Sequence, residues 1–198
     1  MSGTGTTRAD RREELLDAVD AVIREEGPDA SMEALAAGAG ITKPVLYRHF
    51  GDKQGLLAAH AQRVAAELAA EITTELARRR TPRSRIRTTI DTYLAALERA
   101  PRTYWFVARR SAGDGNDVHA AMREVVDRIT AAVALALAEE LAAAGVPTDA
   151  APTWARALVG MVQLVGDRWL AEQDVPREVV VDRLTDLVWL GFRGLGAR

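Results

Sequence analysis

The chain of 198 residues carries a formal net charge of −2, is 48% hydrophobic and 27% charged, and contains no cysteine. This composition is typical of a globular protein with a substantial core, and the missing thiol excludes disulfides, thiolate metal sites and a cysteine nucleophile. No apolar run approaches the roughly 18 residues of a membrane span, and the first residues lack the apolar segment of a signal peptide. We therefore expect a soluble cytoplasmic protein without a membrane partner.

The first predicted helix covers about residues 8–26. Leu15, Val19 and Ile23 recur there at the spacing that places side chains on one buried face. Gly27 and the proline after it are typical of a helix end.

Two short helices joined by a glycine turn follow. Ser31 is a natural N-cap for the first of them, which should stop at the glycines of residues 38–40. Thr42 is expected to cap the second, which runs to Phe50 and ends at Gly51. A short helix, a tight turn and a second helix constitute the helix-turn-helix pattern.

The rest of the chain reads as helices only. A long helix is predicted from Asp52, its cap, to about residue 79, with a proline break after it. Further helices are expected at about 83–99, 102–111, 117–143, 151–173 and 176–193. We predict an all-α fold of about nine helices, with a three-helix domain at 8–53 and a larger helical domain at 54–198.

Local charge favours the second short helix as the functional surface. The first 53 residues hold seven Lys or Arg against ten Asp or Glu, so this domain lacks the basic balance usual in nucleic-acid binders. Residues 42–53, however, hold three cations and one acid, and Arg8, Arg11 and Arg12 cluster near the N-terminus. Any affinity for DNA must therefore depend on where these cations lie.

The helix-turn-helix pattern assigns chemistry to this surface, because its second helix enters the major groove. With Leu46 and Phe50 facing inward, Lys43 could donate to guanine and Val45 could contact a thymine methyl group. Arg48 could donate to guanine or to phosphate. The other polar groups suited to phosphates are Ser31, Tyr47, His49 and Lys53, together with the free N–H groups that open the following helix.

Two other functions stay open from the residues alone. A glycine-turned helix pair is also a common packing motif, so the chain could be a helical interaction module that binds a protein partner. An enzyme is the other alternative. We find no catalytic set, no glycine-rich phosphate loop after a strand, no metal-ligand spacing and no cofactor motif in the sequence.

The segment ALAAGAGITKPVLYRHFGDKQGLL at 34–57 resembles the tetracycline-repressor (TetR) family of transcriptional regulators. The resemblance is specific over about residues 11–60, and Leu46-Tyr47-Arg48-His49-Phe50 carries most of it. It implies that Tyr47, His49 and Lys53 contact the DNA backbone and that Thr42, Lys43, Pro44 and Val45 help to read bases. It also implies a double-stranded operator as partner and a small apolar or amphipathic effector.

One recognition helix covers too few base pairs to be selective, so we expect a homodimer that reads a palindrome. The last two helices offer an apolar surface, and the resemblance implies that such helices pair in a four-helix bundle. The residues predicted for this interface are Leu158, Val162, Val165, Trp169, Leu184, Leu187 and Val188. Gly160 and Gly166 lie in mid-helix, which indicates a packing reason for each.

The resemblance also implies an effector pocket in the larger domain. Candidate lining residues are His60, Tyr93, Tyr104, Trp105, Met122, Trp154, Met161 and Gln163. Each of them could equally be an ordinary core residue. The expected mechanism is repression by the dimer, followed by release when the effector tilts the long helix and changes the spacing of the recognition helices.

Overall fold

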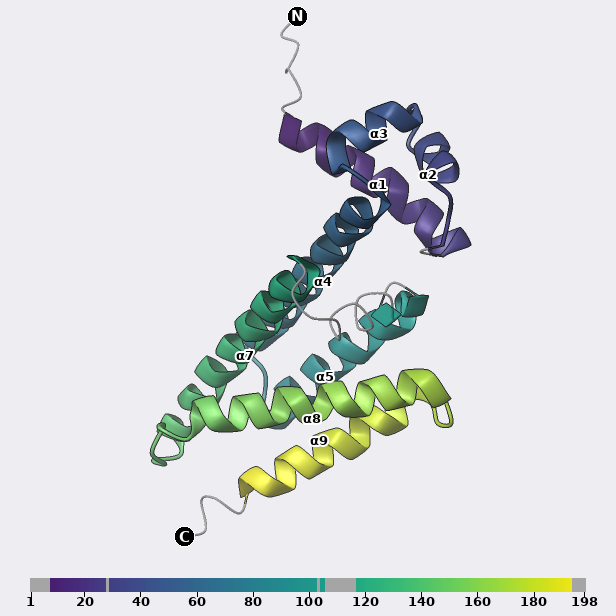
Figure 1. Ribbon diagram of the computed structural model, residues 1–198. Helices are drawn as coiled ribbons and strands as arrows, with labels where there is room; N and C mark the ends of the chain where they lie inside the picture. The colour runs from purple at the N-terminus through teal and green to yellow at the C-terminus, as the bar shows by residue number, and fades with distance from the viewer. Residues whose placement is uncertain (1–7, 28, 103, 106–116, 194–198) are drawn as a thin grey trace, which may run out of the picture. The chain divides into compact units, whose positions relative to one another are not determined.

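The computed structural model describes residues 8–27, 29–102, 104–105 and 117–193 (Figure 1). The fold is all-α, as predicted, and the described residues form eight helices without a strand. They are α1 (Arg8–Glu26), α2 (Met32–Gly38), α3 (Lys43–Phe50), α4 (Lys53–Ala77), α5 (Pro82–Arg99), α7 (Asp117–Ala143), α8 (Ala151–Glu172) and α9 (Arg177–Arg193). The helix predicted at about 102–111 falls mostly outside the described residues. No helix among those described is long and apolar enough to cross a membrane.

Capping explains why the helix ends agree with the predictions to within about two residues. Ser31 Oγ accepts a hydrogen bond from the Ala34 N–H at 3.1 Å, and Asp52 Oδ1 accepts one from the Gly55 N–H at 2.7 Å. Thr42 corrects the expectation in part. It occupies the N-cap position with an extended backbone, but its side chain makes no capping hydrogen bond.

The chain divides into two compact units, and each is described separately. Of the described residues, the head comprises those up to Val64 together with 102, 104–105 and 117–121, and the body comprises Ala65–Pro101 and those from Met122 onward. The division therefore falls within α4, which contributes residues to both units.

The head is built around α1. Its apolar face, led by Leu15, Val19 and Ile23, packs against Leu35 of α2 and Leu46 of α3. All five side chains are at most 1% exposed, so this small three-helix core is closed. Figure 1 shows α2 and α3 alongside α1, the arrangement that holds the two short helices at a fixed angle.

In the body, α5 contacts both α8 and α9. Gly166 of α8 lies so close to α5 that an added Cβ would stand 2.9 Å from Tyr93 Cε1 and 3.1 Å from Leu94 Cδ2. This close approach supplies the packing reason that the sequence indicated for Gly166. Gly160 differs, because a Cβ there would meet no atom of the chain within 4 Å.

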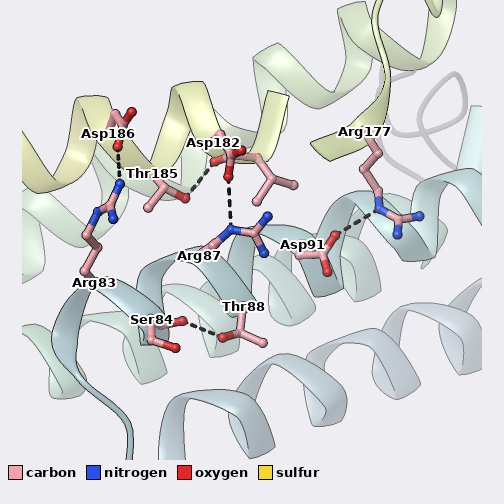
Figure 2. Close-up of polar contacts among 10 residues, drawn as sticks. Arg83, Ser84, Arg87, Thr88, Asp91, Arg177, Asp182, Thr185 and Asp186 are labelled. Atoms are coloured by element: carbon pink, nitrogen blue, oxygen red, sulfur yellow. Dashed lines mark hydrogen bonds and ion pairs between the residues drawn. The ribbon is translucent and has the colours of Figure 1, made fainter. Parts of the chain in front are cut away.

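A series of ion pairs joins α5 and α9 along their length (Figure 2). Arg83 pairs with Asp186 at 2.6 Å and Arg87 pairs with Asp182 at 3.0 Å. Farther along, Arg177 at the start of α9 pairs with Asp91 at 2.9 Å and also with Glu98. Residue numbers rise on α5 as they fall on α9, so the two helices are antiparallel.

Candidate nucleic-acid interface

The turn between α2 and α3 places the second helix across the first. Gly40 adopts a φ of +64°, a left-handed conformation that a side chain would strain. The Ile41 N–H then donates to the Ala36 carbonyl at 3.0 Å, which closes the end of α2. Leu46 and Phe50, four residues apart, anchor α3 in the head core at 0% and 8% exposure.

Anchoring these two residues turns the opposite side of α3 outward. Thr42, Pro44, Tyr47 and Arg48 are exposed. Lys43, Val45 and His49 are half-buried beside them, and Ser31 at the start of α2 is exposed as well. An exposed phenol next to a guanidinium suits phosphate oxygens, so the surface has the donors that a DNA backbone requires.

Lys43 has a partner in the unbound protein. Its Nζ donates a hydrogen bond to Glu33 Oε1 of α2, across the turn of the motif. This hydrogen bond lowers the pKa of Glu33 and raises the pKa of Lys43. Both side chains stay solvent-accessible, at 67% exposure for Glu33 and 40% for Lys43. The pair therefore lies on the surface that the motif would present to DNA.

Two other cations donate hydrogen bonds to backbone carbonyls at the end of α1 and in the loop that leads to α2. Lys53 Nζ donates to the Asp29 carbonyl at 3.0 Å, and Arg102 Nη1 donates to the Glu25 carbonyl at 3.3 Å. Gly27, with a φ of +88°, lies under the aliphatic part of Arg102, and an added Cβ there would be 3.3 Å from Arg102 Cδ. Two of the groups predicted to bind phosphate at the start of α4, Lys53 and the Gly55 N–H, therefore already have hydrogen-bond partners within the head.

The arginines near the N-terminus also make contacts within the head. Arg11 pairs with Glu14 at 2.7 Å, and the guanidinium of Arg12 lies 5.0 Å from the centre of the Phe50 ring. The contact with Phe50 is a cation–π interaction that fixes Arg12 beside the end of α3. The side chain of Arg8 is outside the described set.

His60 of α4 belongs to the head. It is 1% exposed, and neither ring nitrogen has a hydrogen-bond partner. Asp20 Oδ1 of α1 lies 3.6 Å from its Nε2, too far for a hydrogen bond. Burial, together with the charges of Arg63 and Arg24, lowers the pKa of His60 to about 4. The imidazole is therefore neutral at physiological pH and does not form an ion pair.

The remaining pocket candidates are divided between the two units. Tyr93, Trp154 and Met161 are half-buried in the body, and Gln163 is exposed on α8. Tyr104 and Trp105 belong to the head, with their rings edge to face at 5.6 Å. The side chain of Met122 lies outside the described set.

The predicted interface residues separate by burial. Trp169, Leu184 and Val188 are 4–7% exposed and pack within a single chain, which accounts for their apolar character without a partner. Leu158, Val162 and Val165 are half-buried, and Leu187 is 60% exposed. Leu164 and Leu190, which the prediction omitted, are 73% and 64% exposed.

The contacts that Glu33, Asp20 and Arg102 make within the head were not predicted from the sequence. The sequence shows Glu33 as an acid in the first turn of a helix, which is sufficiently explained by the helix dipole. Its partner lies ten positions away on another helix, so no periodicity connects the two. Within the described residues, no group of three or more potential ligand side chains could hold a metal ion.

The head, with its turn and exposed recognition helix, defines a helix-turn-helix protein. Residues 15–60 match the family described as bacterial regulatory proteins, tetR family. Residues 67–195 match the tetracyclin repressor-like C-terminal domain. The chain belongs to the TetR family of transcriptional regulators and carries the family's helix-turn-helix DNA-binding domain.

Similar proteins agree with this assignment. An uncharacterized HTH-type transcriptional regulator of Mycobacterium tuberculosis is 30% identical over 193 residues, which cover 95% of this chain and 80% of the relative. The HTH-type transcriptional activator FasR of Mycolicibacterium smegmatis is 32% identical over 103 residues, which cover 52% of this chain and 47% of FasR.

Solved structures share the fold. A TetR-like regulator of Rhodococcus sp. RHA1 aligns with a TM-score of 0.64 at 28% identity, over 95% of this chain and 98% of the other. The regulator FadR of Bacillus subtilis, in complex with stearoyl-CoA, aligns with a TM-score of 0.70 at 14% identity, over 88% and 96% of the two chains. At this low identity the likeness to FadR concerns the fold alone.

Proposed function

We propose that this regulator is a cytoplasmic homodimeric repressor, without enzymatic activity, that binds a palindromic operator and is released by a small effector. The observation that carries the proposal is the orientation of α3, which buries Leu46 and Phe50 and leaves Tyr47 and Arg48 exposed. In this proposal, the bases are read by Thr42, Lys43, Pro44 and Val45. The backbone is contacted by Ser31, Tyr47, Arg48, His49 and Lys53.

Exposed apolar groups on α8 and α9 support the proposed dimer. Leu164 lies on the same side of α8 as Gly160, at helical spacing of four residues, and Leu187 and Leu190 are exposed on α9. Leaving three large leucines in water is unfavourable by roughly 2 kcal/mol each, relative to burying them. Gly160, with open space around it, would let a second helix approach closely.

The proposed effector is a small apolar or amphipathic molecule bound in the body. The stearoyl-CoA complex of FadR supports this, because an amphipathic ligand is accommodated by that protein on the same fold. Since α4 contributes residues to both units, a ligand-dependent shift of its body part would be transmitted to the head. The heads of the dimer, about 34 Å apart on successive major grooves, would then no longer fit the operator.

Selection of bound sequences from random DNA tests the proposal most directly. We expect an enriched palindrome whose half-sites lie about one helical turn apart, with affinity that falls steeply as salt rises. Failure to enrich any sequence, or binding that is insensitive to salt, would favour a protein-binding module instead. Transcription from a reporter carrying the selected palindrome distinguishes repression from the activation named for FasR.

Tyr47→Ala tests the recognition surface. Each head would lose a phosphate hydrogen bond, so operator affinity should fall by on the order of tenfold or more, measured by fluorescence anisotropy. The fold should persist, because Tyr47 is 39% exposed and the substitution does not alter the anchors Leu46 and Phe50. Tyr47→Phe is the matched control, since it removes the hydroxyl alone and should reproduce most of the loss. Unchanged affinity in both folded variants would refute the assignment.

A further inference from the structure

The ion pair between Lys43 and Glu33 lies where the two helices of the motif come together. Lys43 is the first residue of α3 and Glu33 is the second residue of α2. Their hydrogen bond spans the turn, and both side chains are accessible to solvent. In the segment 31–53, Asp52 is the other acidic residue, and its Oδ1 accepts from the Gly55 N–H. Glu33 is thus the carboxylate of the motif that pairs with its base-reading cation.

A carboxylate on a DNA-binding surface normally opposes binding, because phosphates repel it. Base edges offer it one favourable role, since an acidic side chain can accept a hydrogen bond from the N4 amino group of cytosine. A lysine ammonium has three N–H donors. If one of them stays on Glu33, the other two remain for the O6 and N7 acceptors of guanine.

Across the major-groove edge, a G·C pair presents N7 and O6 as acceptors and then the cytosine N4 amino group as a donor. The Lys43 ammonium would donate to N7 and O6 of guanine, and the Glu33 carboxylate beside it would accept from N4 of cytosine. A free lysine is a flexible point charge that can serve phosphate or any base acceptor, so it discriminates poorly. Held by Glu33, the same ammonium has a preferred position and a carboxylate beside it.

We propose that Glu33 is a specificity-determining residue of the DNA-binding head, which together with Lys43 selects a G·C base pair in each half-site. The carboxylate also reduces non-specific binding, because it competes with phosphate for Lys43 and repels the DNA backbone. This inference rests on the proposed function, since it requires that α3 reads bases.

The test compares wild type, Glu33→Gln and Lys43→Gln by selection from random DNA and by titration against the selected operator. Lys43→Gln identifies the base position that Lys43 reads. At that position, we expect Glu33→Gln to reduce discrimination between G·C and A·T by about fivefold or more, because the neutral amide accepts a hydrogen bond more weakly and no longer holds Lys43 by charge. Binding of Glu33→Gln to unrelated DNA should become tighter.

Two controls separate this effect from simple loss of a negative charge. Glu26→Gln removes the same charge from the exposed end of α1 and should leave base preference unchanged. The double variant Glu33→Gln/Lys43→Gln should lose little more discrimination than Lys43→Gln alone, because the two residues act as one unit. Circular dichroism verifies that each variant, altered only at exposed or half-buried positions, is folded.

The outcomes distinguish this inference from the proposed function. If wild type enriches a palindrome and Glu33→Gln keeps the same preference at every position, Glu33 does not determine specificity. The same conclusion follows if Glu26→Gln relaxes the preference equally. If wild type enriches no sequence, the proposed function fails and this inference fails with it.

Discussion

Burial of an ionisable side chain makes stability depend on pH, and His60 is such a residue in the head. It is 1% exposed, its pKa is lowered from 6.5 to about 4, and Arg24 and Arg63 add to the effect of burial. In the unfolded chain the imidazole takes up a proton near its ordinary pKa, whereas the folded head resists protonation. Asp20, already hydrogen-bonded to Arg24, does not offset the lowering of the His60 pKa.

Between about pH 6.5 and pH 4 the unfolded state therefore binds more protons than the folded state. Stability should fall as the pH drops through this window, and His60 alone should account for about 3 kcal/mol of the loss. Urea unfolding at several pH values measures it. In His60→Gln this component should disappear, so its stability should decline less than that of wild type.

His49→Gln is the matched control for this prediction, since it removes a half-buried histidine from the same unit. If the decline is reduced as much in His49→Gln as in His60→Gln, the pH dependence does not arise from His60 in particular. An equal decline in wild type and His60→Gln between pH 6.5 and pH 4 would show that His60 is protonated in the folded head.

The exposure of a residue was predictable where one helix determines it. The spacing of Leu46 and Phe50 fixed which side of α3 faces inward, so the outward position of Tyr47 and Arg48 followed. Partners on different helices were not predictable, because they depend on how the helices cross. The Lys43–Glu33 pair and the contact of Lys53 with the Asp29 carbonyl are both of this kind.

At the scale of elements, helix limits were predictable because local chemistry sets them. Gly27 and Gly51 both take positive φ values at helix ends, and Ser31 and Asp52 cap helix starts with their side chains. The faces of α8 and α9 were not predictable to the same degree. An apolar stripe indicates that a helix face is covered, but not whether the same chain or a second copy covers it.

The two mid-helix glycines of α8 give an element-scale prediction. Gly166→Val should lower the unfolding free energy by about 1–3 kcal/mol, because its side chain would enter space occupied by Tyr93, Leu94 and Leu97 of α5. Thermal and urea unfolding measure this. Gly160→Ala is the control, and its better helix propensity should leave stability unchanged or higher by up to about 1 kcal/mol. Similar losses in both variants would contradict the close packing of α5 and α8.

At the scale of the whole molecule, the exposed leucines of α9 allow the proposed dimer to be tested. Leu187→Glu/Leu190→Glu should convert a dimer into a monomer, because an apolar interface would then have to bury two uncompensated carboxylates. Analytical ultracentrifugation measures the mass. Since the two leucines are 60% and 64% exposed, each chain should keep its helix content. Operator affinity should fall by on the order of a hundredfold or more as the two heads bind independently.

Leu135→Glu provides the matched control, because Leu135 is 66% exposed on a different helix, α7. This variant should remain dimeric and bind the operator as wild type does. A dimer that persists in Leu187→Glu/Leu190→Glu, or one that Leu135→Glu disrupts equally, would place the interface elsewhere.

The hydrogen bond from Arg102 to the end of α1 bears on how the protein can be dissected. The head is discontinuous in sequence, because Arg102 comes from a part of the chain that follows α5. A fragment of residues 8–64 would retain α1, α2 and α3 but leave the Glu25 carbonyl without this donor. Chimeras that exchange the DNA-binding part should therefore include residue 102 along with the N-terminal segment, so that this contact is kept.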